Sequence, residues 1–330
     1  MNLRNVSALP VSLRSGRSAV PYLPAVAAAA VLMVGLFAWA HEHDDSAAKV
    51  RITERDGYRH VVANGLPDHR TGKCPNRGNP NRISAQKYAF RVPLSPEPAD
   101  GPLPRGKVLA GVALNGVPFD PGTAEGWTAQ RARAHGRPGR HYAWRYEALT
   151  GGFSLGLDRH HAHVQPNGAY HYHALPNGLY ERLAGRPVEQ RPEAMVLLGY
   201  AADGYPMYGP WAHEDPTDAT SALKKLKSSC RVKKGDRPSG ADSPGGRYDV
   251  RFTADWEFVK GHGDLDKHNG RFGVTPQHPA GTYYYVITDT FPFVHRGFQG
   301  APDASFVHRG GPPGRQRGRS EGGRHPSPPR

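Results

Sequence analysis

The sequence predicts a mainly β fold, organised as a single antiparallel sandwich or barrel-like domain with long loops. The chain has 330 residues, of which 40 are glycines and 32 are prolines. This composition favours many turns and short strands over long helices. After residue 48, short runs of β-branched and aromatic residues alternate with Gly, Pro, Asn or Asp, without helical patterns between them. Such spacing is typical of sandwiches and barrels and not of parallel α/β sheets.

The expected strands follow from this pattern in chain order. They cover residues 50–53, 58–62, 87–92, 108–114, 142–146, 170–173, 195–200, 248–252 and 283–288. Asp56 and Gly57 form a two-residue turn signal, which predicts a hairpin between the first two strands. Only residues 221–226 are expected to be helical.

The amino terminus carries an export signal. Arg4, Arg14 and Arg17 precede an apolar run over residues 25–40, which ends in the A-x-A motif of a signal peptidase site at Ala40. We therefore predict a cleaved signal peptide over residues 1–40 and an exported protein, periplasmic or extracellular. The alternative is an N-terminal membrane anchor if the signal is not cleaved. Two prolines interrupt the run upstream and its apolar core is short for a span, so no stable membrane span is expected after cleavage.

The remaining chain divides into a polar leader at residues 41–48, one mostly-β domain at residues 49–300 and a tail at residues 301–330. The tail is rich in Gly, Pro and Arg and is expected to be disordered, because it has too few apolar residues to bury. Cleavage after residue 40 would leave a new terminus that begins His41-Glu42-His43. Its amine, amides and imidazole match the square-planar nitrogen set that Cu(II) and Ni(II) favour.

The net charge of +14 is concentrated at the ends of the chain. Residues 1–40 hold three arginines and no acid, and residues 301–330 hold six arginines against Asp303 and Glu321. What remains for residues 41–300 is an ordinary basic surface, so nucleic-acid binding is not expected.

The two cysteines, Cys74 and Cys230, are compatible with one disulfide or with two free thiols. Neither belongs to a C-x-x-C pair, so a redox-active or thiolate metal site is not expected.

The most informative segment is a histidine-rich hairpin over residues 158–173. Alternate residues of a strand share a face, so His161 and His163 project together, as do His171 and His173. Pro166-Asn167-Gly168 fits a three-residue loop with glycine in the left-handed region. That loop sets His163 opposite His171 and His161 opposite His173, so four imidazoles would meet on one face while the tyrosines between them take the other.

Four converging imidazoles predict a transition-metal site, for copper or zinc. The alternative is a set of histidines that are solvated or bonded to carbonyl and hydroxyl groups. Three ligands with an open position would suit catalysis, and four would suit storage or structure. Asp203 either serves the Asp203-Gly204 hairpin turn or directs a carboxylate at the histidines to complete the metal shell.

The same hairpin resembles the YHYH domain family of exported proteins, through Tyr170-His171-Tyr172-His173 and the preceding residues 162–166. Further similar segments lie at residues 64–69, 79–83, 110–117, 199–210 and 265–271. The resemblance covers most of residues 65–300 and implies a named exported domain without an established reaction. Family members carry Asn or Cys before this hairpin, where this chain has His160 and His161, and Cys before the later Asn-Gly, where it has His268. The resemblance therefore supports His163, His171 and His173 more strongly than His161.

Three functions remain open. The chain has no Walker, dinucleotide-binding or H-E-x-x-H motif, so nucleotide-binding and zincin functions are unsupported. The first hypothesis is an exported protein that binds copper or zinc through His161, His163, His171, His173 and Asp203. The second is a metal-dependent enzyme that uses the same histidines. The third is an extracellular interaction domain without metal, in which tyrosines and tryptophans form the contact surface.

Overall fold

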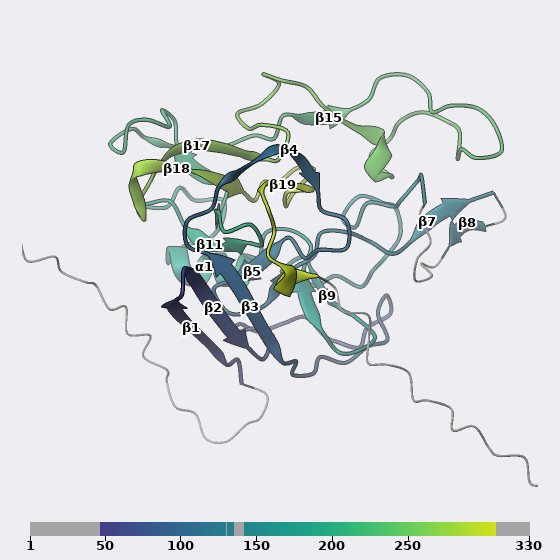
Figure 1. Cartoon of the computed structure of the whole chain (residues 1–330). Helices are drawn as coiled ribbons and strands as arrows, with labels where there is room; N and C mark the ends of the chain where they lie inside the picture. Colours follow the sequence, from purple (N-terminus) through teal and green to yellow (C-terminus); the bar gives the residue numbers. More distant parts are fainter. Residues whose placement is uncertain (1–46, 130, 135–141, 308–330) are drawn as a thin grey trace, which may run out of the picture. The chain divides into compact units, whose positions relative to one another are not determined.

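The computed structural model describes residues 47–129, 131–134 and 142–307. Within these ranges the chain forms nineteen strands, one α-helix and two short 3-10 helices (Figure 1). The prediction of a mainly β fold with antiparallel sheets is confirmed. None of the helices in the described ranges has the length and apolar character needed to cross a membrane.

The predicted signal peptide at residues 1–40 lies outside the described residues, as do most of the polar leader at 41–48 and the tail from residue 308 onward. The described chain continues beyond residue 300, where the tail was expected to begin. A 3-10 helix, η2 (Ala304–Phe306), buries Phe306. Phe306 packs against β2 and β3 residues, so the packed part of the chain extends at least to Val307.

The largest sheet has eight strands and carries the histidine hairpin. Its order is β17 (Gly270–Thr275), β18 (His278–Val286), β12 (Pro206–Tyr208), β11 (Leu197–Ala201), β5 (Gly111–Ala113), β6 (Pro118–Phe119), β10 (Tyr170–Tyr172) and β9 (Ala162–Val164). Five of the neighbouring pairs are antiparallel, whereas β10–β6 and β12–β18 are parallel. The sheet is therefore open, with the histidine hairpin at the edge formed by β9.

The smaller sheets surround this one. The three-stranded sheet has the order β1 (Val50–Arg55), β2 (Tyr58–Ala63) and β3 (Tyr88–Pro93), which lie side by side in Figure 1. The two-stranded sheets pair β13 (Trp211–His213) with β14 (Leu223–Lys225), β15 (Cys230–Val232) with β16 (Trp256–Phe258), β19 (Gly297–Gly300) with β4 (Pro98–Pro104), and β7 (Gly126–Thr128) with β8 (Arg131–Ala134). The predicted hairpin turn between β1 and β2 is confirmed, because Asp56 and Gly57 both have positive φ.

Three local predictions are wrong. The expected helix at residues 221–226 contains the strand β14, because its residues pair with β13. The expected strands at residues 142–146 and 248–252 are irregular segments joined by the isolated bridge Tyr146–Phe252. Val250 in the second segment has a φ of 74°, and an extended strand cannot continue through that conformation.

The α-helix of the described chain, α1 (Asn177–Ala184), was not predicted. It begins after Pro176 and ends at Gly185, whose φ of 67° and bond to the Glu181 carbonyl close the last turn. The Pro-Asn-Gly sequence at its start has the composition of a turn, and the helix is short, so its apolar pattern is weak.

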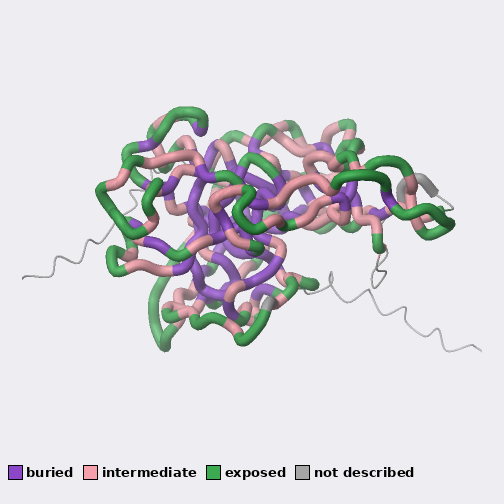
Figure 2. Tube along the Cα trace, turned by 90° about the horizontal axis from the view of Figure 1, so that it is seen from above, coloured by how far each residue is buried: buried purple, intermediate pink, exposed green. Residues whose placement is uncertain are grey.

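The core beneath the histidine hairpin is built from aromatic side chains. Its largest cluster includes Phe119, Tyr170, Tyr172, Leu179 and Tyr285, all buried. Figure 2 shows the buried residues in purple at the centre of the described chain, with exposed residues in the surrounding loops. The tyrosine face of β10 thus belongs to the core.

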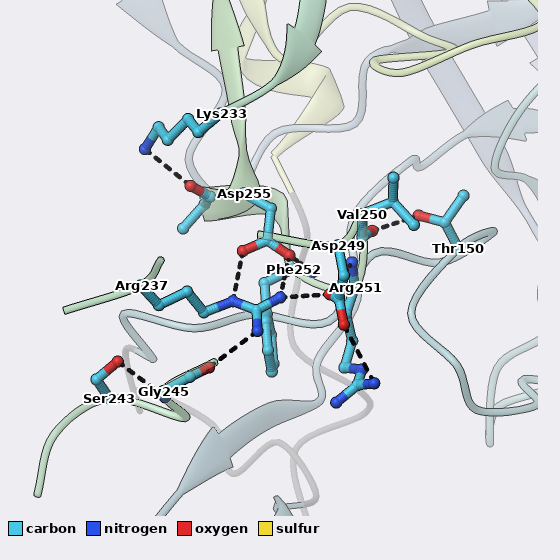
Figure 3. Close-up of polar contacts among 11 residues, drawn as sticks. Thr150, Lys233, Arg237, Ser243, Gly245, Asp249, Val250, Arg251, Phe252 and Asp255 are labelled. Atoms are coloured by element: carbon cyan, nitrogen blue, oxygen red, sulfur yellow. Dashed lines mark hydrogen bonds and ion pairs between the residues drawn. The ribbon is translucent and has the colours of Figure 1, made fainter. Parts of the chain in front are cut away.

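The glycine-rich loop at residues 233–246, after β15, contains a buried arginine. The Arg237 side chain is only 3% exposed and forms an ion pair with the wholly buried Asp255. Its guanidinium donates to both Asp255 oxygens, at 2.8 and 2.7 Å, and also contacts Asp249 and the Gly245 carbonyl (Figure 3). Most residues of the loop are exposed, and Arg237 anchors them to η1 (Thr253–Asp255).

Both cysteines of the chain are free thiols. Cys74 packs beside the main core cluster, and Cys230 packs beside a separate cluster that contains Phe291 and Phe293. The disulfide that the sequence left open is therefore not formed.

Candidate metal centre

The histidine hairpin has the predicted register. In the β9–β10 ladder His163 lies opposite His171, and Tyr170 and Tyr172 lie opposite Val164 and Ala162. Gly168 closes the loop with a φ of 86°, and the Gln165 amide donates to the Ala169 carbonyl at 2.9 Å. This turn fixes which residues of the two strands face each other.

Three histidines converge on one side of the hairpin. The ring centroids of His163, His171 and His173 are 4.6 to 4.8 Å apart. One nitrogen of each ring lies within 4.8 Å of the others. His171 is 3% exposed and His173 is 1% exposed, whereas His163 is half-buried. The group is therefore recessed, with its open side at His163.

His161 lies outside this group because the chain turns before it. The Asp158 carboxylate accepts the His160 amide at 2.8 Å, and the His161 amide donates to the Asp158 carbonyl at 3.0 Å. His161 then adopts a φ of 55°, which ends strand alternation. Its Nδ1 lies 2.8 Å from the carbonyl oxygen of Leu175 instead.

Asp203 also lies outside the histidine group. Its Oδ2 accepts hydrogen bonds from the Tyr285 hydroxyl at 2.6 Å and from the Gly300 amide at 3.0 Å. The residue follows β11 in the tight turn that leads to β12, and the Gly204 amide donates to the Ala201 carbonyl. These contacts tie β19 to the large sheet, so the observed role of Asp203 is structural.

Burial raises the pKa of Asp203 to about 6, although its hydrogen bonds with Tyr285 and Gly300 oppose the shift. The pKa of an aspartate in the unfolded chain is about 3.9. The folded protein thus binds this proton more tightly, and the Asp203 contribution to the free energy of unfolding should rise as pH falls from about 6 to about 4, by roughly 2–3 kcal/mol in total.

In an Asp203→Asn variant this contribution disappears. We expect the unfolding free energy of the wild type to increase relative to that of the variant as pH falls from about 6 to about 4. Urea denaturation of both proteins at about pH 4 and about pH 7 measures it. A difference that is the same at both pH values would contradict the assignment.

Backbone carbonyls select the ligand nitrogens of two histidines. His163 Nδ1 lies 3.2 Å from the Leu155 carbonyl oxygen, and His171 Nδ1 lies 3.3 Å from that of Ala169. Since a carbonyl oxygen only accepts, each Nδ1 carries the proton and the lone pair is on Nε2. This arrangement is common for metal-binding histidines, whose second nitrogen donates to a carbonyl or carboxylate.

His173 differs from the other two. Both of its ring nitrogens are buried, and neither has a hydrogen-bond partner among the described residues. A neutral imidazole has one donor and one acceptor nitrogen, and a buried polar atom left unpaired costs about 1–3 kcal/mol. No hydrogen bond among the described residues therefore explains why the polar His173 ring is buried at this position.

The environment keeps His163 and His173 neutral. Burial lowers the pKa of His163 to about 4, with a further contribution from His171. Burial also lowers the pKa of His173 well below its usual range, and the His171 and His163 rings add to the effect. Neutral imidazole is the form that binds a metal ion, so both rings are ready to act as ligands at neutral pH.

The opposite face of the hairpin is fixed by hydrogen bonds to its tyrosines. The Tyr170 hydroxyl donates to Asp158 at 2.7 Å. The Tyr172 hydroxyl lies 2.8 Å from His69 Nε2 and accepts from the Asn115 amide at 2.9 Å. Since Tyr172 is the last residue of β10 and lies between His171 and His173 in the chain, these bonds hold the backbone that carries the metal candidates.

Neither His69 nor Asn115 was predicted from the sequence to be a site residue. Both lie in segments that carry the resemblance, at residues 64–69 and 110–117. Their contacts join positions 103 and 57 residues apart from Tyr172. Only the folded arrangement reveals that they support the hairpin.

Comparison with known proteins agrees with this arrangement. A family model described as YHYH protein matches residues 89–300, a range that includes β9, β10 and the three converging histidines. Searches of curated proteins and of solved structures find no match to the chain. Because the model spans more than half of the sequence and contains the hairpin, the chain belongs to the YHYH family.

Proposed function

We propose that the protein binds a transition-metal ion through His163, His171 and His173. The observation that carries the proposal is the burial of His173 beside two other imidazoles, with neither of its own ring nitrogens hydrogen-bonded among the described residues. A metal bond would satisfy one of these nitrogens and would convert the unfavourable cluster into a favourable one.

Zinc and copper are the ions best suited to this donor set. Three imidazole nitrogens, without a thiolate, match the catalytic type of zinc site and the ligands that copper accepts. At zinc–nitrogen distances of about 2.0–2.1 Å, tetrahedral ligands are about 3.3–3.4 Å apart. The candidate nitrogens lie within 4.8 Å of one another, so small rotations of the rings would close the site.

The three-histidine set also supports a second candidate function, a metal-dependent enzyme. A tetrahedral ion held by three protein ligands keeps one position for water or substrate. The half-buried His163 marks the accessible side of the group. The interaction-domain hypothesis has less support, because the tyrosines it requires at the surface, such as Tyr170, Tyr208 and Tyr284, are buried.

Export is part of the proposal. The A-x-A site at Ala40 and the arginines before the apolar run support secretion to the periplasm or the extracellular space. The mature protein would then meet its metal ion outside the cytoplasm.

Metal binding is tested by titrating the metal-free protein with zinc and, separately, with Cu(II), in competition with a chromophoric chelator. We expect one equivalent of at least one ion to bind with a dissociation constant below the micromolar range, where the binding free energy exceeds about 8 kcal/mol in magnitude. Failure of both ions to bind would refute the proposed function. Substrate turnover by the loaded protein would favour the enzyme over a binding protein.

A further inference from the structure

The three histidines differ in the partners available to their second nitrogens. Once one nitrogen of an imidazole binds a metal ion, the other carries a proton and needs an acceptor. His163 and His171 already have acceptors, the carbonyls of Leu155 and Ala169. His173 has none among the described residues. A complete site therefore requires an acceptor near His173.

The sheet register brings Asp120 next to His173. Tyr172 of β10 pairs in parallel with Phe119 of β6, and the Asp120 amide donates to the Tyr172 carbonyl at 2.9 Å. Side chains alternate along a strand, and paired strands are about 4.8 Å apart. The rings of Phe119 and Tyr172 are neighbours on the core face, so Asp120 and His173, each one residue later, are neighbours on the histidine face.

The Asp120 carboxylate is buried and held in place. The residue is 8% exposed, and its Oδ1 accepts from Arg105 Nη1 at 3.0 Å. The same guanidinium nitrogen donates to the Val108 carbonyl. A carboxylate has about four lone-pair positions, so it can accept several hydrogen bonds at once.

Two charged side chains lie close enough to His173 to act on it. Besides its two histidine neighbours, Asp120 and Arg296 influence the His173 ring. A guanidinium can only donate, and Arg296 is already bound to Glu147. Of these two groups only Asp120 can accept a hydrogen bond, and the structure shows no hydrogen bond between it and His173.

We propose that Asp120 accepts the second N–H of His173 when His173 binds the metal ion. This inference rests on the proposed metal site. Asp120 would act as a positioning residue, because its carboxylate fixes the orientation and tautomer of His173 and makes its ligand nitrogen more basic. The arrangement is a metal–histidine–carboxylate chain held from behind by Arg105.

The test compares zinc affinity in the wild type, Asp120→Asn and Asp120→Glu. Loss of a carboxylate that supports a metal-binding histidine lowers metal affinity by about 10–100-fold. We expect this loss in Asp120→Asn and a partial recovery in Asp120→Glu, which keeps the charge. The matched control is Glu125→Gln, because Glu125 acts on His163, whose second nitrogen already faces the Leu155 carbonyl. Its zinc affinity should remain within about twofold of the wild type.

A second measurement detects the Asp120–His173 hydrogen bond directly. Its main observation is made on the wild-type protein, so it does not depend on how well a variant folds. In zinc-loaded wild-type protein labelled with ¹⁵N at histidine, the His173 N–H proton should resonate downfield of those of His163 and His171, since a carboxylate accepts more strongly than a carbonyl. Asp120→Asn should remove the downfield shift of the His173 proton and leave the His163 and His171 protons unchanged. Wild-type affinity in Asp120→Asn, or a His173 proton that resonates with the other two, would overturn the inference while leaving the metal site intact. A wild type that binds no zinc or copper would instead refute the proposed function.

Discussion

Replacement of His173 by leucine should abolish high-affinity metal binding and stabilise the metal-free protein. Both His173 nitrogens are buried without partners, so a leucine of similar volume removes two unpaired polar atoms and should raise the free energy of unfolding by about 1 kcal/mol. Zinc sites with four ligands are worth about 10–16 kcal/mol, so loss of one ligand should weaken binding by about 100-fold or more. Chelator competition and urea denaturation of the metal-free proteins measure the two effects.

The matched control is His161→Asn. His161 belongs to the same hairpin, but its ring faces the Leu175 carbonyl and its φ is positive, a conformation that asparagine tolerates. This variant should bind metal as the wild type does. A histidine that is kept for folding would give the opposite result, in which His173→Leu destabilises the protein and leaves metal affinity unchanged.

The largest expected loss of stability follows from replacing Arg237 by leucine. The substitution leaves Asp255, whose side chain is 0% exposed, as a buried carboxylate without its cation. Removal of one partner from a buried ion pair costs about 3–5 kcal/mol. We expect a loss of this size in urea denaturation.

The neighbouring pair provides the control for Arg237. Asp249 contacts the same guanidinium but is 40% exposed, so Asp249→Asn should cost no more than about 1 kcal/mol. If Arg237→Leu and Asp249→Asn lowered the free energy of unfolding equally, the burial of Asp255 would not be the cause of the destabilisation. Because the affected loop is distant in sequence from the hairpin, metal affinity provides an independent check that the folded protein retains its site.

The histidine hairpin could be predicted because its determinants are local. Pro166, Asn167 and Gly168 specify a three-residue loop, and that loop alone sets His163 opposite His171. The alternation of tyrosine and histidine then separates a core face from a ligand face. The same local logic identified the turn at Asp56 and Gly57.

The rest of the site depends on contacts that the linear sequence does not specify. Strand alternation predicts that His161 joins His163, but the side chain of Asp158 binds backbone amides and turns the chain at that point. For Asp203 the sequence left open a role in the turn or a carboxylate directed at the histidines, and its partners, Tyr285 and Gly300, are 82 and 97 residues away. Asp120 was not predicted as a site residue. Only the parallel register of β6 and β10 shows that it lies near His173.

The measurement that tests the central claim most directly is an anomalous-difference map, recorded at the absorption edge of the bound metal, from crystals of the metal-loaded protein. The account predicts one strong peak about 2.0–2.1 Å from a single nitrogen of each of His163, His171 and His173. His161 and Asp203 should keep the contacts described above. A peak at any other position, or the absence of a peak in protein that has taken up one equivalent of metal, would contradict the assignment of these three histidines as the metal centre.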